Sequence, residues 1–138
     1  MTVFQADERR SDCPISVSLE IFGDRWSLLV IRDLMFKGRE AFKDFLGAEE
    51  GIASNVLSDR LKRLEAHGLI ERQPHPDDAR KLRYQLTGKG LDLAPVLVET
   101  IIWAAKYEKT AAPPKLVGQM SEDRAGFLAG LRASRKQR

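Results

Sequence analysis

The chain has 138 residues, of which 43% are hydrophobic and 31% charged, and its formal net charge is +3. This balance predicts one globular domain with enough apolar material for a core. No stretch approaches the roughly 18 uninterrupted apolar residues of a membrane span, and residues 2–10 do not resemble a signal peptide. A single cysteine and two histidines exclude an intramolecular disulfide and give too few ligands for a structural zinc site. We therefore expect a cytoplasmic protein without a metal ion or cofactor.

Three short helices are predicted in the first part of the chain. Apolar residues at helical spacing predict a helix over 14–22, with Pro14 in its first turn. Asp24 is a candidate N-cap for a second helix over 25–34, whose apolar character on most sides indicates burial. A third short helix fits residues 41–47.

The clearest amphipathic helix follows, over 55–65. It carries one stripe of leucines at offsets of three and four residues, and Gly68 is placed to end it. Behind it, alternating residues predict a two-stranded hairpin with strands at 69–72 and 82–87, joined by a turn-rich charged loop over 74–81.

The last part of the chain is predicted to be helical. Thr87 is a candidate cap for a long helix over 88–109, which Pro95 is expected to kink. Pro113 and Pro114 interrupt the helical pattern. After them, Ser121, Glu122 and Asp123 are candidate caps for a last helix with a basic tail. We predict four segments: a flexible arm (1–12), a DNA-binding and dimerisation domain (13–109), a linker (110–120), and a C-terminal helix with a basic tail (121–138).

This order of elements predicts a mainly α-helical winged helix-turn-helix with a small β-hairpin. In that fold the second helix of the motif lies in the major groove of DNA. Turning the leucine stripe toward the core directs the opposite side of the helix outward. The predicted DNA-contact residues on this helix are Ser54, Asn55, Val56, Ser58, Asp59, Lys62 and Arg63.

The chemistry of these side chains suits base edges and phosphates. Asn55 suits an adenine edge, while Lys62 and Arg63 suit guanine or phosphate. Asp59 either accepts a hydrogen bond from cytosine or orients Arg63, one turn away. The N-terminus of the same helix favours a phosphate.

Basic residues are concentrated around this helix and the hairpin. Residues 60–89 contain eight Lys or Arg and four Asp or Glu, and a local excess of cations is where a polyanion would bind. Arg80 and Lys81 are adjacent cations in the predicted hairpin loop, and we expect them to contact a minor groove or flanking phosphates. A solvated charged loop is the alternative.

The chain resembles HxlR-type winged helix-turn-helix transcriptional regulators over about 13–103. This resemblance implies a two-fold dimer held by N- and C-terminal helices, two DNA half-sites, and regulation of transcription in response to small molecules or redox-active compounds. The acidic-then-basic order of the wing, 77–83, looks more like that of MarR-type ligand-responsive repressors. The agreement rests on Cys13-Pro14, Gly23-Asp24-Arg25-Trp26-Ser27-Leu28-Leu29, Gly38, Phe42, Gly51-Ile52, Leu57, Arg60-Leu61, Leu64, Gly68-Leu69-Ile70, Arg72, Tyr84-Gln85-Leu86-Thr87, Gly90, Leu93, Pro95-Val96-Leu97 and Trp103.

Three residues are candidates for sensing an effector. Cys13 precedes a helix N-terminus, where the helix dipole favours the thiolate. In some regulators of this type a cysteine at this place senses quinones, aldehydes or oxidants; the alternative is a small hydrophobic residue buried at a dimer interface. Trp26 and Trp103 are candidates for lining a pocket for an aromatic effector, although core packing is the commoner role of such residues.

The predicted partners are double-stranded DNA, as a pseudo-palindromic operator, and a second copy of the chain. No cluster of nucleophile, base and orienting residue and no glycine-rich phosphate loop indicates an enzyme. A winged helix used only to bind protein is the rival hypothesis, but such a surface would carry apolar anchors where 54–63 offers polar and charged residues. The predicted function is therefore sequence-specific regulation of transcription, as a repressor.

Overall fold

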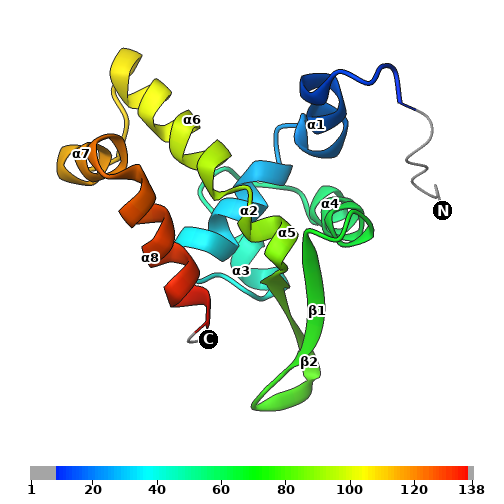
Figure 1. Ribbon diagram of the computed structural model, residues 1–138. Coiled ribbons are helices and arrows are strands. Elements are labelled where there is room, and N and C mark those ends of the chain that lie inside the picture. Colours follow the sequence, from blue (N-terminus) through cyan, green and yellow to red (C-terminus); the bar gives the residue numbers. More distant parts are fainter. Residues whose placement is uncertain (1–8, 137–138) are drawn as a thin grey trace. The chain divides into compact units, whose positions relative to one another are not determined.

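The computed structural model describes residues 9–136 (Figure 1). The chain divides between Gly90 and Leu91 into two compact units. Most of the predicted N-terminal arm, residues 1–8, lies outside the described residues. Within 9–136, no helix has both the length and the apolar character needed to cross a membrane.

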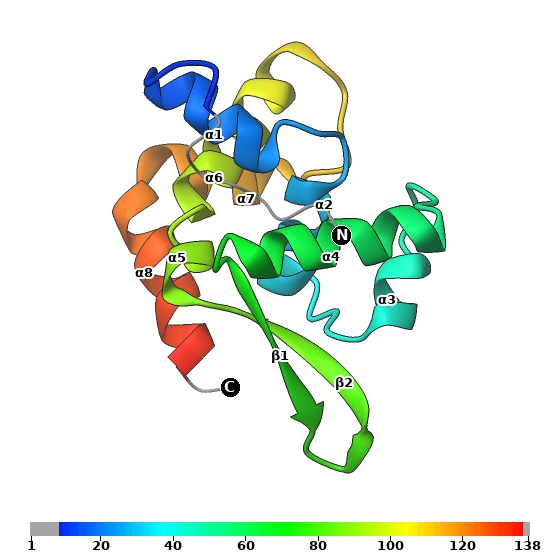
Figure 2. The ribbon, with the colours of Figure 1, turned by 90° about the vertical axis from the view of Figure 1, so that its right-hand side faces the viewer.

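The first unit contains helices followed by an antiparallel hairpin, as predicted. Figures 1 and 2 show the hairpin projecting away from the helices of this unit. The elements are α1 (Pro14–Phe22), α2 (Ser27–Phe36), α3 (Phe42–Leu46), α4 (Ser54–Ala66), β1 (Ile70–His75) and β2 (Asp78–Leu86), with α5 (Gly88–Leu91) at its end.

The core of this unit is built from buried side chains of α2, α3, α4 and the hairpin. Ile31 of α2, Phe45 of α3 and Ile70 of β1 are at most 1% exposed, and Leu57 and Leu64 of α4 are equally buried. The predicted leucine stripe is thereby confirmed. It fixes which side of α4 faces outward, because residues half a turn away from the stripe must point to solvent.

Helix α4 ends at the predicted glycine. Gly68 has a φ of +74°, a conformation that glycine adopts without a steric penalty. The N–H of Leu69 donates to the carbonyl of Leu64 at 3.0 Å, and that of Gly68 donates to the carbonyl of Glu65 at 2.9 Å. These two bonds form a Schellman motif, which satisfies the last carbonyls of the helix and turns the chain directly into β1.

The hairpin is longer than the sequence predicts. Its strands extend to His75 and from Asp78, so most of the predicted loop 74–81 lies within the strands, although residues 79–81 have no partner in the register. The register of the two strands shifts between Pro74 and His75. Proline has no N–H group to donate to the partner strand, so the regular pairing is interrupted there. On the other edge of β2, the N–H of Tyr84 donates to the carbonyl of Glu40 at 2.8 Å, which holds the base of the hairpin to the segment before α3.

The prediction of one long helix over 88–109 is wrong. The structure has α5 and, after a break, α6 (Ala94–Tyr107) in the second unit. Pro95 stands in the first turn of α6, where its missing N–H costs nothing, so it starts a helix and does not kink one.

The predicted linker 110–120 is also helical over much of its length. It contains most of α7 (Pro114–Glu122), with Pro114 in the first turn, and α8 (Arg124–Lys136) follows. The predicted cap of the last helix is confirmed at Asp123, whose Oδ1 accepts the N–H of Gly126 at 3.1 Å. Within this second unit, α7 packs against α6 and α8, and Arg132 of α8 bonds to Asp92 at 3.2 Å.

Candidate nucleic-acid interface

The predicted DNA-contact residues of α4 all lie on one helix and reach solvent. None of them is buried, in contrast to the three leucines between them. Four are exposed, namely Ser54, Asn55, Asp59 and Lys62, and three are half-buried, namely Val56, Ser58 and Arg63. The outer side of α4 is therefore a surface of amide, hydroxyl, carboxylate and cationic groups.

The N-terminus of α4 lacks a side-chain cap. Its N-cap residue is Ala53, which has no group that can accept a hydrogen bond from the first turn. Helices α5 and α8 differ, because Thr87 Oγ1 accepts the N–H of Gly90 and Asp123 caps α8. A helix start without a side-chain cap, beside Ser54 and Asn55, favours an anion such as a phosphate.

Arg60, which is not among the predicted site residues, ties α4 to the start of α2. Arg60 donates from Nε to Asp24 Oδ2 at 2.8 Å and from Nη1 to Asp59. Asp24 also accepts the N–H groups of Trp26 at 2.9 Å and Ser27 at 3.0 Å. It thus binds the start of α2, but the N-cap residue is Trp26 and not the predicted Asp24, because the helix begins at Ser27. Burial opposes ionisation of Asp24, but the hydrogen bonds from Ser27, Trp26 and Arg60 outweigh it and lower the pKa of this carboxyl.

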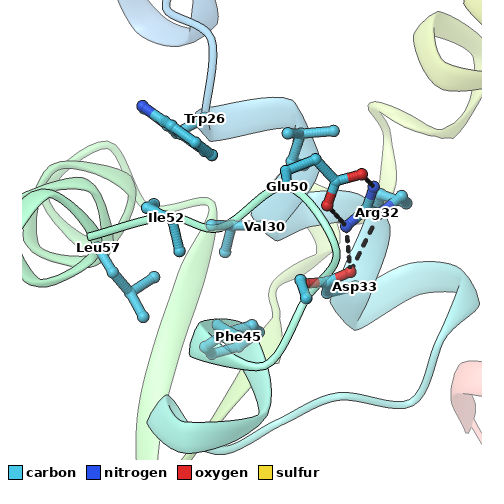
Figure 3. A pocket seen from close by; sticks show the side chains of 10 residues that line it. Trp26, Val30, Arg32, Asp33, Phe45, Glu50, Ile52 and Leu57 are labelled. Carbon is cyan, nitrogen blue, oxygen red and sulfur yellow. Dashed lines mark hydrogen bonds and ion pairs between the residues drawn. The ribbon is translucent and has the colours of Figure 1, made fainter. Parts of the chain in front are cut away.

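A second group of charged residues supports the turn that leads into α4. Arg32 bridges Glu50, at 2.7 Å, and the buried Asp33, at 2.8 Å, as Figure 3 shows. Arg39 reaches the same oxygen of Asp33 at 2.9 Å. Hydrogen bonds from Arg32 lower the pKa of Glu50 to about 2, and the bonds to Glu50 raise that of Arg32. This network ties α2 to the residues before α4.

A pocket lies next to this network, between α2, α3 and the first turns of α4. It contains about 240 Å³ of empty space, part of it open to solvent, and Trp26, Val30, Phe45, Ile52 and Leu57 contribute to its walls (Figure 3).

Of the two tryptophans predicted to line an effector pocket, Trp26 lines this one and Trp103 is not among its lining residues. Trp103 is 65% exposed on α6, where its ring lies 5.6 Å from that of Tyr107.

Cys13 is the N-cap residue of α1 and is exposed. Hydrogen bonds from the backbone N–H groups of Ser16 and Ile15 lower the pKa of its thiol. In the single chain the thiol is accessible to solvent, so the alternative of a buried small residue would require a second copy to cover it.

The wing presents its cations on a strand. Arg80 and Lys81 are exposed, but they lie within β2 and not in a loop, because the tip consists of Pro76 and Asp77. The N–H and Nε of Arg80 donate to Asp78 Oδ1 at 3.1 and 3.3 Å. These backbone and side-chain bonds from Arg80 lower the pKa of Asp78.

A sequence profile described as HxlR-like helix-turn-helix matches residues 21–112. The chain belongs to the HxlR-like helix-turn-helix family. The predicted resemblance and the winged helix-turn-helix fold are thus confirmed, and the chain is a DNA-binding transcriptional regulator.

Several relatives in this family are named HTH-type transcriptional regulators. The uncharacterized regulator sll1512 of Synechocystis is 37% identical over 62% of this chain and 63% of its own length. The uncharacterized regulator YvaP of Bacillus subtilis is 34% identical over 69% of this chain and 88% of its own. YodB of Bacillus subtilis is 35% identical over 69% of this chain and 85% of its own.

Solved structures of other regulators are similar to this one. The reduced form of YodB covers 70% of this chain and 95% of its own, with a TM-score of 0.58 and 35% identity. YodB has also been solved after diamide treatment and with a bound quinone. The redox regulator HypR in its oxidized form covers 71% of this chain and all of its own, with a TM-score of 0.62 and 25% identity.

Proposed function

We propose that this regulator acts as a cytoplasmic homodimeric repressor that binds a pseudo-palindromic operator, with α4 in the major groove of each half-site and the hairpin beside it. The observation that carries the proposal is the outer side of α4. Polar and charged groups stand there on a helix whose opposite side is fixed in the core by leucines. A rigid helix with such a surface is the form in which proteins read base edges.

The individual roles follow from donor and acceptor chemistry. Asn55 presents an amide to an adenine edge, and Lys62 and Arg63 present donors to guanine or to phosphate. Arg80 and Lys81 of the wing contact phosphates or the minor groove beside the half-site. The residues of α4 select a sequence, and the two cations of the wing add affinity for any duplex.

The proposed dimer is supported by apolar side chains exposed on two helices. On α1, Ile15 is 71% and Leu19 57% exposed; on α6, Trp103 and Tyr107 are more than half exposed. Large apolar side chains grouped on one helix in this way mark a surface that a partner covers. A two-fold dimer would place two copies of α4 about one DNA turn apart.

A mobility-shift titration tests the DNA-binding function. The duplex is the region upstream of the regulator's own gene, and the titration is repeated over a range of salt concentrations. We expect the protein to bind this duplex more tightly than random DNA. Its affinity for the duplex should fall steeply as the salt concentration rises. Lys62→Ala with Arg63→Ala should weaken binding and reduce the preference, whereas Lys115→Ala on α7 should bind as the wild type does.

Two negative results would each remove part of the proposal. Absence of salt-sensitive binding would favour a winged helix that binds only protein. A monomer in sedimentation at micromolar concentration would contradict the dimer.

We also propose that Cys13 responds to electrophiles or oxidants. Its exposed thiol with a lowered pKa supports this, as do the structures of YodB treated with diamide or bound to a quinone. The thiolate would add to a quinone ring, or the thiols of two copies would form a disulfide while diamide takes up the two hydrogens. Operator binding by the wild type should change on treatment and that of Cys13→Ser should not; identical responses would exclude a sensor role.

A further inference from the structure

Arg60 connects the segment before α2 to the outer side of α4. Its Nε donates to Asp24, 36 positions earlier in the chain, and its Nη1 donates to Asp59, its neighbour. The side chain of Asp59 is 57% exposed, whereas those of Asp24 and Arg60 are 22% and 20% exposed. One guanidinium therefore joins an anchored carboxylate to a carboxylate on the candidate DNA surface.

Asp24 is a firm anchor because other groups hold it as well. Ser27 Oγ donates to its Oδ1 at 2.5 Å, and the N–H groups of Ser27 and Trp26 donate to its Oδ2. Rotating this carboxylate would break its hydrogen bonds to the start of α2. Arg60 is consequently held in one orientation relative to α2. Because its guanidinium is planar and rigid, this orientation also fixes the direction of the carboxylate to which it donates.

Asp59 needs such a partner in order to face DNA. A lone carboxylate on this side of α4 would be repelled by phosphates. Paired with Arg60, whose guanidinium also bonds Asp24, its charge is partly compensated and its direction is set. The bond engages Oδ2, which leaves Oδ1 as the oxygen we assign to the amino group of cytosine, the base for which a carboxylate is a matching acceptor.

We infer that Arg60 is a positioning residue that sets the base preference contributed by Asp59, with Asp24 as its anchor. The inference rests on the proposed function, because it requires the outer side of α4 to face bases. Arg60 acts through Asp59 and not on DNA directly. A change at Arg60 therefore alters the preference at the base pair that Asp59 reads, in each half-site.

The test is a selection of duplexes from a random library with the wild type, Asp59→Asn, Arg60→Lys and the double variant. Dissociation constants are then measured for the selected site and for its substitutions at the base pair where Asp59→Asn differs from the wild type. We expect Asp59→Asn to reduce discrimination at that pair by about tenfold. Arg60→Lys should reduce it to a similar extent, since an ammonium cannot bond both carboxylates as a guanidinium fork does. The double variant should match Asp59→Asn alone.

Arg32→Lys is the matched control for a loss of stability. Arg32 also bridges two carboxylates, Asp33 and Glu50, but it stands on α2. Thermal unfolding followed by circular dichroism is expected to show lowered midpoints for both lysine variants. Only Arg60→Lys should change discrimination between bases, and Arg32→Lys should retain the wild-type pattern at every position.

The outcomes separate this inference from the function on which it rests. Failure of the wild type to enrich any sequence would overturn the proposed function and the inference together. Enrichment by the wild type, followed by unchanged discrimination in Arg60→Lys or an equal loss of affinity for all sequences, would overturn the role of Arg60 alone. A preference that Asp59→Asn leaves unchanged would do the same.

Discussion

The recognition helix α4 and the wing differ in how firmly their cations are held. Arg60 of α4 has a side chain that is 20% exposed and bonded to two carboxylates, one of them in the segment before α2. Arg80 of the wing has a side chain 92% exposed, and its partner, Asp78, belongs to the same strand. The same type of residue is thus part of the scaffold in one region and a solvated charge in the other.

This difference matches two tasks in DNA binding. A contact to a base edge gives specificity only if the side chain is placed in advance, because a mobile group adapts to more than one base. A contact to phosphate depends mostly on charge and tolerates motion. We therefore expect α4 to determine which sequence is bound and the wing to determine how tightly any duplex is bound.

The largest effect should come from removing the support of α4. Leu61 is 2% exposed, and Leu61→Ala should lower the free energy of unfolding by about 2–5 kcal/mol, because it leaves a cavity under the helix. Leu82 of the wing is 46% exposed, and Leu82→Ala should change that free energy by no more than about 0.5 kcal/mol. Urea titrations of both variants measure the difference; equal losses would mean that the wing is as tightly packed as the helix.

How much of this contrast could be predicted from the sequence depends on the range of the interactions. The leucine stripe and the Gly68 stop of α4 are local patterns, and both were predicted because periodicity and capping act within one or two turns. The extension of the strands past Pro74 was missed, because pairing with a partner strand overrides the local turn signal.

The bond between Arg60 and Asp24 lay beyond prediction from one sequence. Each residue looks like an ordinary charge, and nothing local relates positions 36 apart. The only visible signal is that Asp59 and Arg60 are adjacent, whereas helical spacing relates Asp59 to Arg63 instead. Pro95 was misread for a related reason, since a proline early in a helical pattern fits a kink or a new start equally well.

The next effect concerns base discrimination by α4. Asn55→Ala should remove about 1–3 kcal/mol of discrimination at one base pair of each half-site, because the amide that pairs with adenine is lost. Binding is measured against the selected operator and its single-base variants. Ser134→Ala, on exposed α8, is a control that should leave the pattern unchanged. A uniform loss at all base pairs in Asn55→Ala would assign this residue to phosphate.

A smaller effect is the pH dependence of stability that we expect from the pair of Glu50 and Arg32, which supports the turn before α4. The pKa of Glu50 is lowered from 4.5 to about 2 by Arg32, so its ionised form stabilises the folded chain. This contribution is fully present above pH 4.5 and is lost as the pH falls toward 2. Allowing for solvent screening, we expect it to be about 1 kcal/mol at neutral pH.

Glu50→Gln lacks this contribution, so the difference in the free energy of unfolding from the wild type should shrink as acid is added. Urea titrations between neutral pH and pH 3 follow it. Glu49→Gln removes the same charge one residue earlier. The same narrowing in both variants would contradict the assignment to the pair of Arg32 and Glu50.

The smallest effect should come from a single cation of the wing. Lys81→Ala should weaken binding to specific and random duplexes by the same factor, and should reduce the slope of log K against log salt by about 0.9, because one phosphate contact is lost. Lys115→Ala, an exposed lysine of α7, is the matched control and should leave the slope unchanged. If Lys81→Ala instead changed the preference at a particular base pair, the wing would read sequence, and the division of tasks between α4 and the wing would be wrong.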